Sequence, residues 1–279
     1  MRLGAPLFAT INDPDRWVAE LRRLGYGAAY CPLEASADDA TIAAYRAAAD
    51  RAGIVIAEVG AWSNPLSPDS ETRRAALSHC QAQLALADRI GARCCVNIAG
   101  SLGSKWDGPF ADDLSESAFD LIVETVRAII DAVRPTRTYY ALETMPWMYP
   151  DSAESYTRLL HAVDRRQFAV HFDAANLINS PERLFNSGAV IRQFCHDLGP
   201  LIRSCHLKDV AMEDRFMVHI NEVRPGLGCL DYRALLTELA QLDPDLPLML
   251  EHLPDADSYS QAAAYVRAQA VASNLTWRT

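Results

Sequence analysis

Short apolar runs alternate with longer amphipathic segments along the whole chain. The apolar runs are β-branched or continuously apolar, which is typical of strands buried on both faces of a parallel sheet. The amphipathic segments repeat apolar residues at helical spacing. The pattern predicts eight strands, over residues 2–8, 28–32, 54–59, 93–98, 139–143, 168–172, 203–207 and 248–251.

Eight helices are predicted between and after these strands, over residues 13–24, 37–51, 70–90, 116–133, 153–163, 189–198, 232–242 and 258–272. Side chains suited to capping stand at four of the starts, and a glycine suited to the left-handed conformation follows four of the ends. These are Asp13 with Pro14, Ser36, Ser152 and Asp231 at the starts, and Gly25, Gly53, Gly91 and Gly199 after the ends. Eight βα units predict a (β/α)₈ TIM barrel, α/β in class, as a single domain over residues 1–279.

Composition narrows the possible partners. The chain has 279 residues, half of them apolar, with 36 acidic and 26 basic side chains and a formal charge of -10. This charge repels nucleic acid and anionic membranes. Because no apolar run approaches the ~20 residues of a membrane span and no signal peptide is visible, we expect a cytoplasmic protein. Seven cysteines without CxxC spacing favour reduced thiols and no metal bound at sulfur.

The last four predicted strands each end on a possible metal ligand, namely Glu143, Asp173, His206 and Glu251. In a barrel these ends lie on one rim. Three carboxylates and one imidazole form a hard, oxygen-rich set that suits Mn²⁺ best, with Mg²⁺ or Co²⁺ as alternatives and zinc less favoured. Any one of them alone could be a strand-end residue bonded to a loop, so the evidence is their joint placement.

Several motifs carry a family resemblance: ALET, HFDAAN, CHLKD, RPGLG followed by LDY, and LMLEH. They resemble the xylose-isomerase-like barrel superfamily of sugar isomerases and epimerases. Between Glu143 and His252 the order and spacing are similar to those of ketose 3-epimerases, inosose dehydratases and hydroxypyruvate isomerases. The resemblance implies that Glu143 and Glu251 bind a divalent ion and act as the acid/base pair. It also implies that Asp173 and His206 complete the coordination.

Two further residues lie two positions from a ligand candidate and so face the same side of a strand. His171 precedes Asp173 and could act catalytically as a proton relay, or could be a hydrogen-bonded histidine of the barrel interior. Lys208 follows His206 and could bind a substrate oxygen. A pairing of Lys208 with Asp209 or another strand-end carboxylate is the plainer alternative.

Other positions are candidates for substrate binding. Arg224 matches an arginine that contacts substrate in related epimerases, although it could be a solvated loop residue. At the position of Asn176, several ketose epimerases resemble one another in having a substrate-binding histidine. This chain has an asparagine there, and the difference weakens the assignment of a free ketose as substrate. Glu58, Trp62 and Asn97 come at earlier strand ends and could line the sugar side of the pocket or belong to the scaffold.

Aromatic loops at residues 143–148 and around Trp106 could stack on a sugar or on an aromatic aglycone, or could contact a partner subunit or a second copy. The leading hypothesis is a divalent-metal-dependent sugar isomerase or epimerase that abstracts a proton next to a carbonyl and stabilises the enediolate. The alternative is a lyase that eliminates a β-substituent from a 3-keto sugar or glycoside, of the inosose dehydratase or C-glycoside deglycosidase type. An unphosphorylated sugar is preferred, since no phosphate-binding helix start is visible.

Two less favoured hypotheses come from other classes. Apurinic endonucleases resemble this barrel and its metal-rich rim, but they need more histidines and a basic groove than this chain offers. A barrel that has lost activity and serves as a subunit is the non-enzymatic alternative, and the intact Glu143 and Glu251 argue against it.

Overall fold

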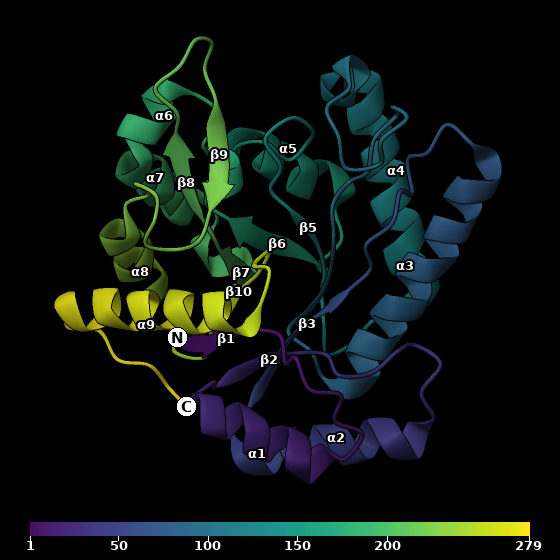
Figure 1. The fold of residues 1–279 in the computed structure, drawn as a ribbon. Coiled ribbons are helices and arrows are strands. Elements are labelled where there is room, and N and C mark those ends of the chain that lie inside the picture. Colours follow the sequence, from purple (N-terminus) through teal and green to yellow (C-terminus); the bar gives the residue numbers. More distant parts are fainter.

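The computed structural model describes residues 1–279 and contains eight parallel strands in one nearly closed barrel (Figure 1). The strand order is β1-β10-β7-β6-β5-β4-β3-β2. Between the two ends of this order, the Gly27 amide donates to the Leu3 carbonyl at 3.0 Å. The barrel strands are β1 (Arg2–Gly4), β2 (Ala28–Tyr30), β3 (Val55–Gly60), β4 (Cys94–Asn97), β5 (Tyr140–Glu143), β6 (Phe168–Asp173), β7 (Ile202–Leu207) and β10 (Pro247–Leu250).

Helices connect successive strands and cover the outside of the barrel (Figure 1). They are α1 (Pro14–Leu24), α2 (Asp39–Ala52), α3 (Ser70–Ile90), α4 (Glu116–Val133), α5 (Ala153–Val163), α6 (Pro181–Phe185), α7 (Ser187–Leu198), α8 (Tyr232–Ala240) and α9 (Ala256–Ala272), with short 3₁₀ turns at Ala111–Leu114, Ala175–Leu177 and Gly199–Leu201. The predicted TIM barrel is confirmed. No helix combines the length and the apolar character that crossing a bilayer requires.

Local chemistry at the helix ends explains most of the boundaries. Asp13 caps α1 by accepting a hydrogen bond from the Arg16 amide at 2.8 Å. Asp38 caps α2, where the sequence suggested Ser36. The glycines after α1, α2 and α3 have left-handed φ angles of 71°, 68° and 80°. The prediction was wrong for Gly199, whose φ of -44° is right-handed because it opens a 3₁₀ turn.

Two elements were absent from the prediction. An antiparallel hairpin of β8 (Asp209–Met212) and β9 (Ile220–Val223) follows β7 and projects from the barrel (Figure 1). The short helix α6 precedes α7. Strand β1 is also shorter than predicted and ends at Gly4, two residues before Pro6, which has no amide hydrogen to give to a strand ladder. The residues that follow Gly4 form a loop over the barrel end instead.

Candidate active site

The strand register brings the four predicted ligands together. On β6 and β7, Asp173 pairs directly with His206. His206 pairs with Met249 on β10, two residues before Glu251. Glu143 is the last residue of β5, which neighbours β6. One ligand atom from each of the four side chains lies within 4.8 Å of those of the others.

His206 sits among the carboxylates. Its Nδ1 lies 2.7 Å from Glu251 Oε1 and 3.1 Å from Glu143 Oε1. Burial alone would lower the pKa of His206, but the surrounding carboxylates outweigh burial and raise it well above its ordinary value. Burial likewise favours a higher pKa for Glu143, but Lys208 and His206 hold that pKa well below its usual range. For Asp173 burial dominates and raises the pKa to about 7.

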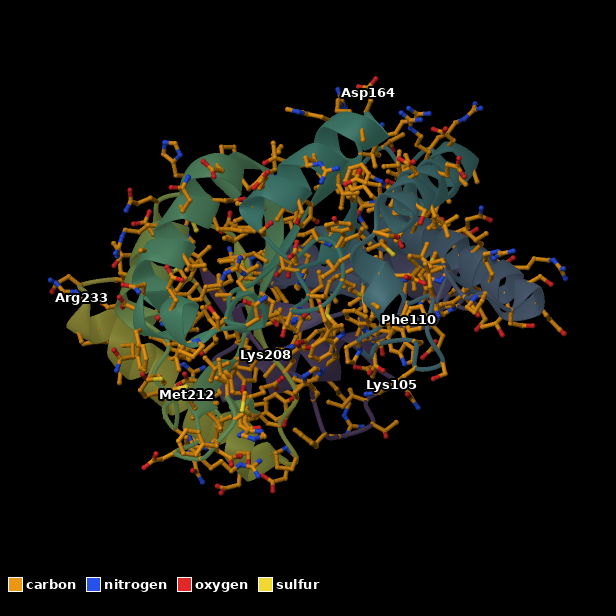
Figure 2. The ribbon with its side chains drawn as sticks, turned by 90° about the horizontal axis from the view of Figure 1, so that it is seen from above. Lys105, Phe110, Asp164, Lys208, Met212 and Arg233 are labelled. Atoms are coloured by element: carbon orange, nitrogen blue, oxygen red, sulfur yellow. The ribbon has the colours of Figure 1, made fainter.

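Lys208 lies in the middle of this cluster, near the centre of the barrel as labelled in Figure 2. Its Nζ is 2.5 Å from Glu251 Oε1, 2.8 Å from Asp173 Oδ2 and 3.5 Å from Glu143 Oε1. Burial opposes its charge, but these carboxylates keep the pKa of Lys208 well above its ordinary value. The partners of the lysine are therefore the ligand candidates and not the adjacent Asp209.

The donor set fits a divalent cation. Asp173 Oδ2 and Glu251 Oε1 are buried and accept no hydrogen bond of good geometry, although the Lys208 ammonium lies within ion-pair distance of both. Buried carboxylate oxygens need a charged or hydrogen-bonding partner. A hard divalent ion provides one, with Glu143 and His206 completing a set of three carboxylates and one imidazole.

A second polar layer lies deeper in the barrel, and it changes the interpretation of Glu58 and His171. Glu58 is 1% exposed and makes three short contacts: Oε1 to His206 Nε2 at 3.0 Å, and Oε2 to His171 Nε2 at 3.0 Å and to Ser204 Oγ at 2.8 Å. His171 is fully buried. Neither side chain reaches the cavity. The structure therefore places Glu58 and His171 beneath the cavity, in the hydrogen-bonded interior position that the sequence analysis left as an alternative for His171.

Of the other substrate-binding candidates, some line the cavity and some do not. Trp62 lines the cavity, and its ring centroid lies 6.3 Å from that of His206. Asn176 also lines it and donates from Nδ2 to Glu143 Oε1 at 3.1 Å. Asn97 is fully buried. Its side-chain amide bonds the backbone of Ser63, in the loop after β3, and contacts Cys80 Sγ on α3 at 3.5 Å. The structure therefore places Asn97 in the scaffold.

Arg224 does not line the cavity, and its guanidinium bonds the Pro225 carbonyl at 3.3 Å. The loop that carries it is held by Asp209, whose carboxylate accepts hydrogen bonds from four backbone amides. These amides belong to Val210, Gly226, Gly228 and Leu230, at 2.9–3.1 Å. A Cβ at position 228 would lie 2.3 Å from Asp209 Oδ1, so this glycine allows the loop to close on the carboxylate.

A cavity of about 820 Å³ opens over the cluster. Glu143 and Glu251 line it, whereas Asp173 and His206 lie beneath its floor. Among the lining residues that the sequence interpretation missed are Glu222 and His252, which lie close to Glu251 and Lys208. His252 Nδ1 lies 3.2 Å from Glu222 Oε2. The signal available for His252 was its place directly after Glu251, whereas Glu222 lies on the hairpin that was not predicted.

Comparison with solved structures shows the same fold in several proteins. A 3-keto-D-glucoside 4-epimerase from E. coli aligns with a TM-score of 0.68 at 16% identity, over 96% of this chain and 99% of that one. A probable 3-DHS dehydratase from Bacillus anthracis gives 0.70 at 16%, over 96% and 98%. Endonuclease IV from Thermus thermophilus gives 0.73 at 15%, over 98% and 100%. At these identities the likeness establishes the fold alone.

The sequence comparisons give one positive result. A search of curated proteins found no match to the chain. The family model described as xylose isomerase-like TIM barrel matches residues 18–269, which include every barrel strand except β1 and all four residues of the ligand cluster. The chain therefore belongs to the xylose isomerase-like TIM barrel family.

Proposed function

We propose that the protein is a divalent-metal-dependent enzyme that removes a proton from the carbon next to the carbonyl of a sugar or keto-sugar, as an isomerase or epimerase. The observation that carries this proposal is the division within the ligand cluster. Glu143 and Glu251 reach the cavity, whereas Asp173 and His206 are buried under it. Two carboxylates in contact with both the cation site and the cavity are suited to moving protons on a bound substrate.

The residues of the chain have separate tasks in this proposal. Glu143, Asp173, His206 and Glu251 would hold the cation, with Mn²⁺ as the favoured ion for this hard donor set. When bound, the cation supplies charge stabilisation for substrate oxygen that becomes negative. Glu143 and Glu251 take and return the proton. Asn176 orients the Glu143 carboxylate through its side-chain amide.

Lys208 and Glu58 support these groups. Lys208 balances part of the negative charge of the cluster, since its ammonium contacts Asp173 and Glu251. Glu58 is ionised and can only accept hydrogen bonds, so His206 must donate to it from Nε2. The raised pKa of His206 means that Nδ1 also carries a proton, toward Glu143, when no metal is bound. A cation held at the site would displace this proton, and Nδ1 would then face the cation as a neutral imidazole ligand.

A second candidate function is elimination of a β-substituent by the same proton abstraction. Asn176, in place of a substrate-binding histidine, and a cavity much larger than a monosaccharide favour it. Both reactions share the first step and differ in whether a leaving group departs.

Proton exchange in D₂O tests the proposal directly. The Mn²⁺-loaded protein is incubated with free ketoses and with 3-keto glucosides, and the products are followed by NMR and mass spectrometry. Deuterium next to the carbonyl with an epimer or isomer supports the first function, and a dehydrated product or released aglycone supports the second. The absence of exchange with every substrate, in protein shown to contain the metal, would overturn both.

A further inference from the structure

Three tryptophans surround the cavity and expose a large part of their surface. Trp62 is 41% exposed, and Trp106 and Trp147 are each 36% exposed. They come from the loops after β3, β4 and β5, so they form one side of the opening. Exposed aromatic surface gathered in a concave site marks a place where a ligand binds.

These side chains are held in place. The indole of Trp62 folds over Gly60, where an added Cβ would lie 2.4 Å from Nε1. The indole of Trp147 donates from Nε1 to the Asp107 carbonyl at 3.2 Å, which ties the loop after β5 to the loop that carries Trp106. The aromatic faces therefore form a wall that exists before any ligand binds, and little ordering is needed on binding.

Next to this wall, the lining over β2 and β1 is also apolar; β2 neighbours β3 in the barrel, and β1 follows β2. Pro6, Leu7 and Ile11 come from the loop after β1, and Tyr30 and Cys31 come from the end of β2. In all, 15 of the 28 lining residues are hydrophobic. A free sugar carries hydroxyl groups on most of its carbons, and such a wall would leave many of them without hydrogen-bond partners.

Size supports the same conclusion. Pockets of ~300–1,000 Å³ hold drug-sized ligands, and this cavity of about 820 Å³ lies in the upper part of that range. A monosaccharide seated on Glu143 and Glu251 would leave most of the volume empty. The remaining space is lined largely by apolar side chains, and it therefore suits an apolar group of the ligand.

We propose that the wall formed by Trp62, Trp106 and Trp147 is a subsite for a flat, uncharged hydrophobic group attached to the sugar. The substrate class is then an aryl glycoside or its keto derivative and not a free monosaccharide. This inference rests on the proposed function for the sugar end of the cavity. The cavity lining has four carboxylates, on Glu143, Glu222, Glu251 and Asp107, against the two ammonium groups of Lys105 and Lys208, and this acidic excess disfavours an anionic substituent.

Binding of matched probes tests the subsite without turnover. The Mn²⁺-loaded protein is titrated by calorimetry with phenyl β-D-glucoside, methyl β-D-glucoside and glucose. We expect the phenyl glucoside to bind at least about tenfold more tightly than the methyl glucoside, because a stacked ring gains from both burial and aromatic contact. Equal affinities, or no binding of either glycoside at millimolar concentration, would overturn the proposal.

Variants assign the preference to the wall. Trp106→Ala and Trp147→Ala should each reduce the phenyl-to-methyl ratio by about three- to tenfold and leave binding of the methyl glucoside unchanged. Gly60→Ala should act in the same direction by displacing Trp62. Phe185→Ala is the matched control, because Phe185 is 73% exposed on α6 and does not line the cavity. An unchanged ratio in both tryptophan variants would contradict the assignment.

Three outcomes distinguish the failure of this subsite from the failure of the proposed reaction, and the subsite from a dimer interface. If the aryl preference is found but no substrate exchanges a proton in D₂O, the subsite stands and the proposed reaction fails. If proton exchange occurs equally on the methyl and phenyl 3-keto glucosides, the reaction stands and the subsite fails. Light scattering that shows a dimer dissociating in the tryptophan variants would mean that the wall is covered by a second copy, which also overturns the proposal.

Discussion

The His206 ring lies between the carboxylates of Glu58 and Glu251, with Nε2 3.0 Å from Glu58 Oε1 and Nδ1 2.7 Å from Glu251 Oε1. Glu58 lies on β3 and His206 on β7, so the contact crosses the barrel interior. A carboxylate that accepts from one ring nitrogen fixes the tautomer and leaves the other nitrogen free to bind a metal. We therefore expect Glu58 to act as a positioning residue for the proposed cation site.

Glu58→Gln tests this relationship. Because an amide is a weaker acceptor than a carboxylate and can turn its NH₂ group toward His206, we expect Mn²⁺ affinity to fall by about 10–100-fold. The measurement is a competition titration against a chelator, with circular dichroism to confirm the fold. Glu116→Gln is the control, since Glu116 is an exposed carboxylate that pairs with Arg158. Wild-type Mn²⁺ affinity in Glu58→Gln would show that Glu58 does not position His206 for metal binding.

Lys208→Met tests whether the ammonium balances the cluster. Without it, Asp173 and Glu251 lose their nearest cation, and breaking a buried ion pair costs about 3–5 kcal/mol. We expect metal-free protein to unfold at a clearly lower denaturant concentration, and saturating Mn²⁺ to restore most of the difference. Lys105→Met is the control, because Lys105 pairs with Asp107 at the surface. Equal loss of stability with and without metal would show that packing, not charge, is the role of Lys208.

Asp209→Asn tests the loop that carries Arg224. The carboxylate accepts four backbone hydrogen bonds while fully buried, and an amide can accept on only one of its two atoms. We expect a loss of about 3 kcal/mol in the free energy of unfolding, measured in urea. Asp15→Asn, which removes an exposed partner of Arg51, should cost under about 1 kcal/mol. A loss no larger than that of this control would show that the loop does not depend on Asp209.

The four-residue cluster could be predicted because strand ends in a parallel barrel share one rim. The alternation of side chains along a strand gives the side that a residue faces but not its depth. Glu58 stands two residues before the end of β3 and therefore lies one layer below the cavity. Asn97 ends β4 but faces α3, where it contacts Cys80.

Register shifts between Ala29 and Tyr30 and between Val170 and His171 also alter which side chains meet, and no sequence pattern announces them. The hairpin was missed for a related reason. Its strands have four residues each and are partly exposed, so their apolar alternation is too short to distinguish from a loop. Glu222, which the hairpin brings to the cavity, was lost with it.

Glu143→Gln separates metal binding from proton transfer. Glutamine has the same shape as glutamate and can stay next to Asn176 and His206, but it has no carboxylate that could act as a base. At Mn²⁺ concentrations that saturate the variant, verified by metal analysis, we expect the rate of deuterium exchange to fall by about 10²–10⁴-fold with the fold intact. Asp173→Asn is the comparison, because Asp173 is a ligand candidate that lies beneath the cavity floor and does not reach the substrate. We expect this substitution to lower metal affinity, and a high Mn²⁺ concentration to recover much of the exchange rate. Recovery of the Glu143→Gln rate by added Mn²⁺ would make Glu143 a ligand only and leave Glu251 as the acid/base group.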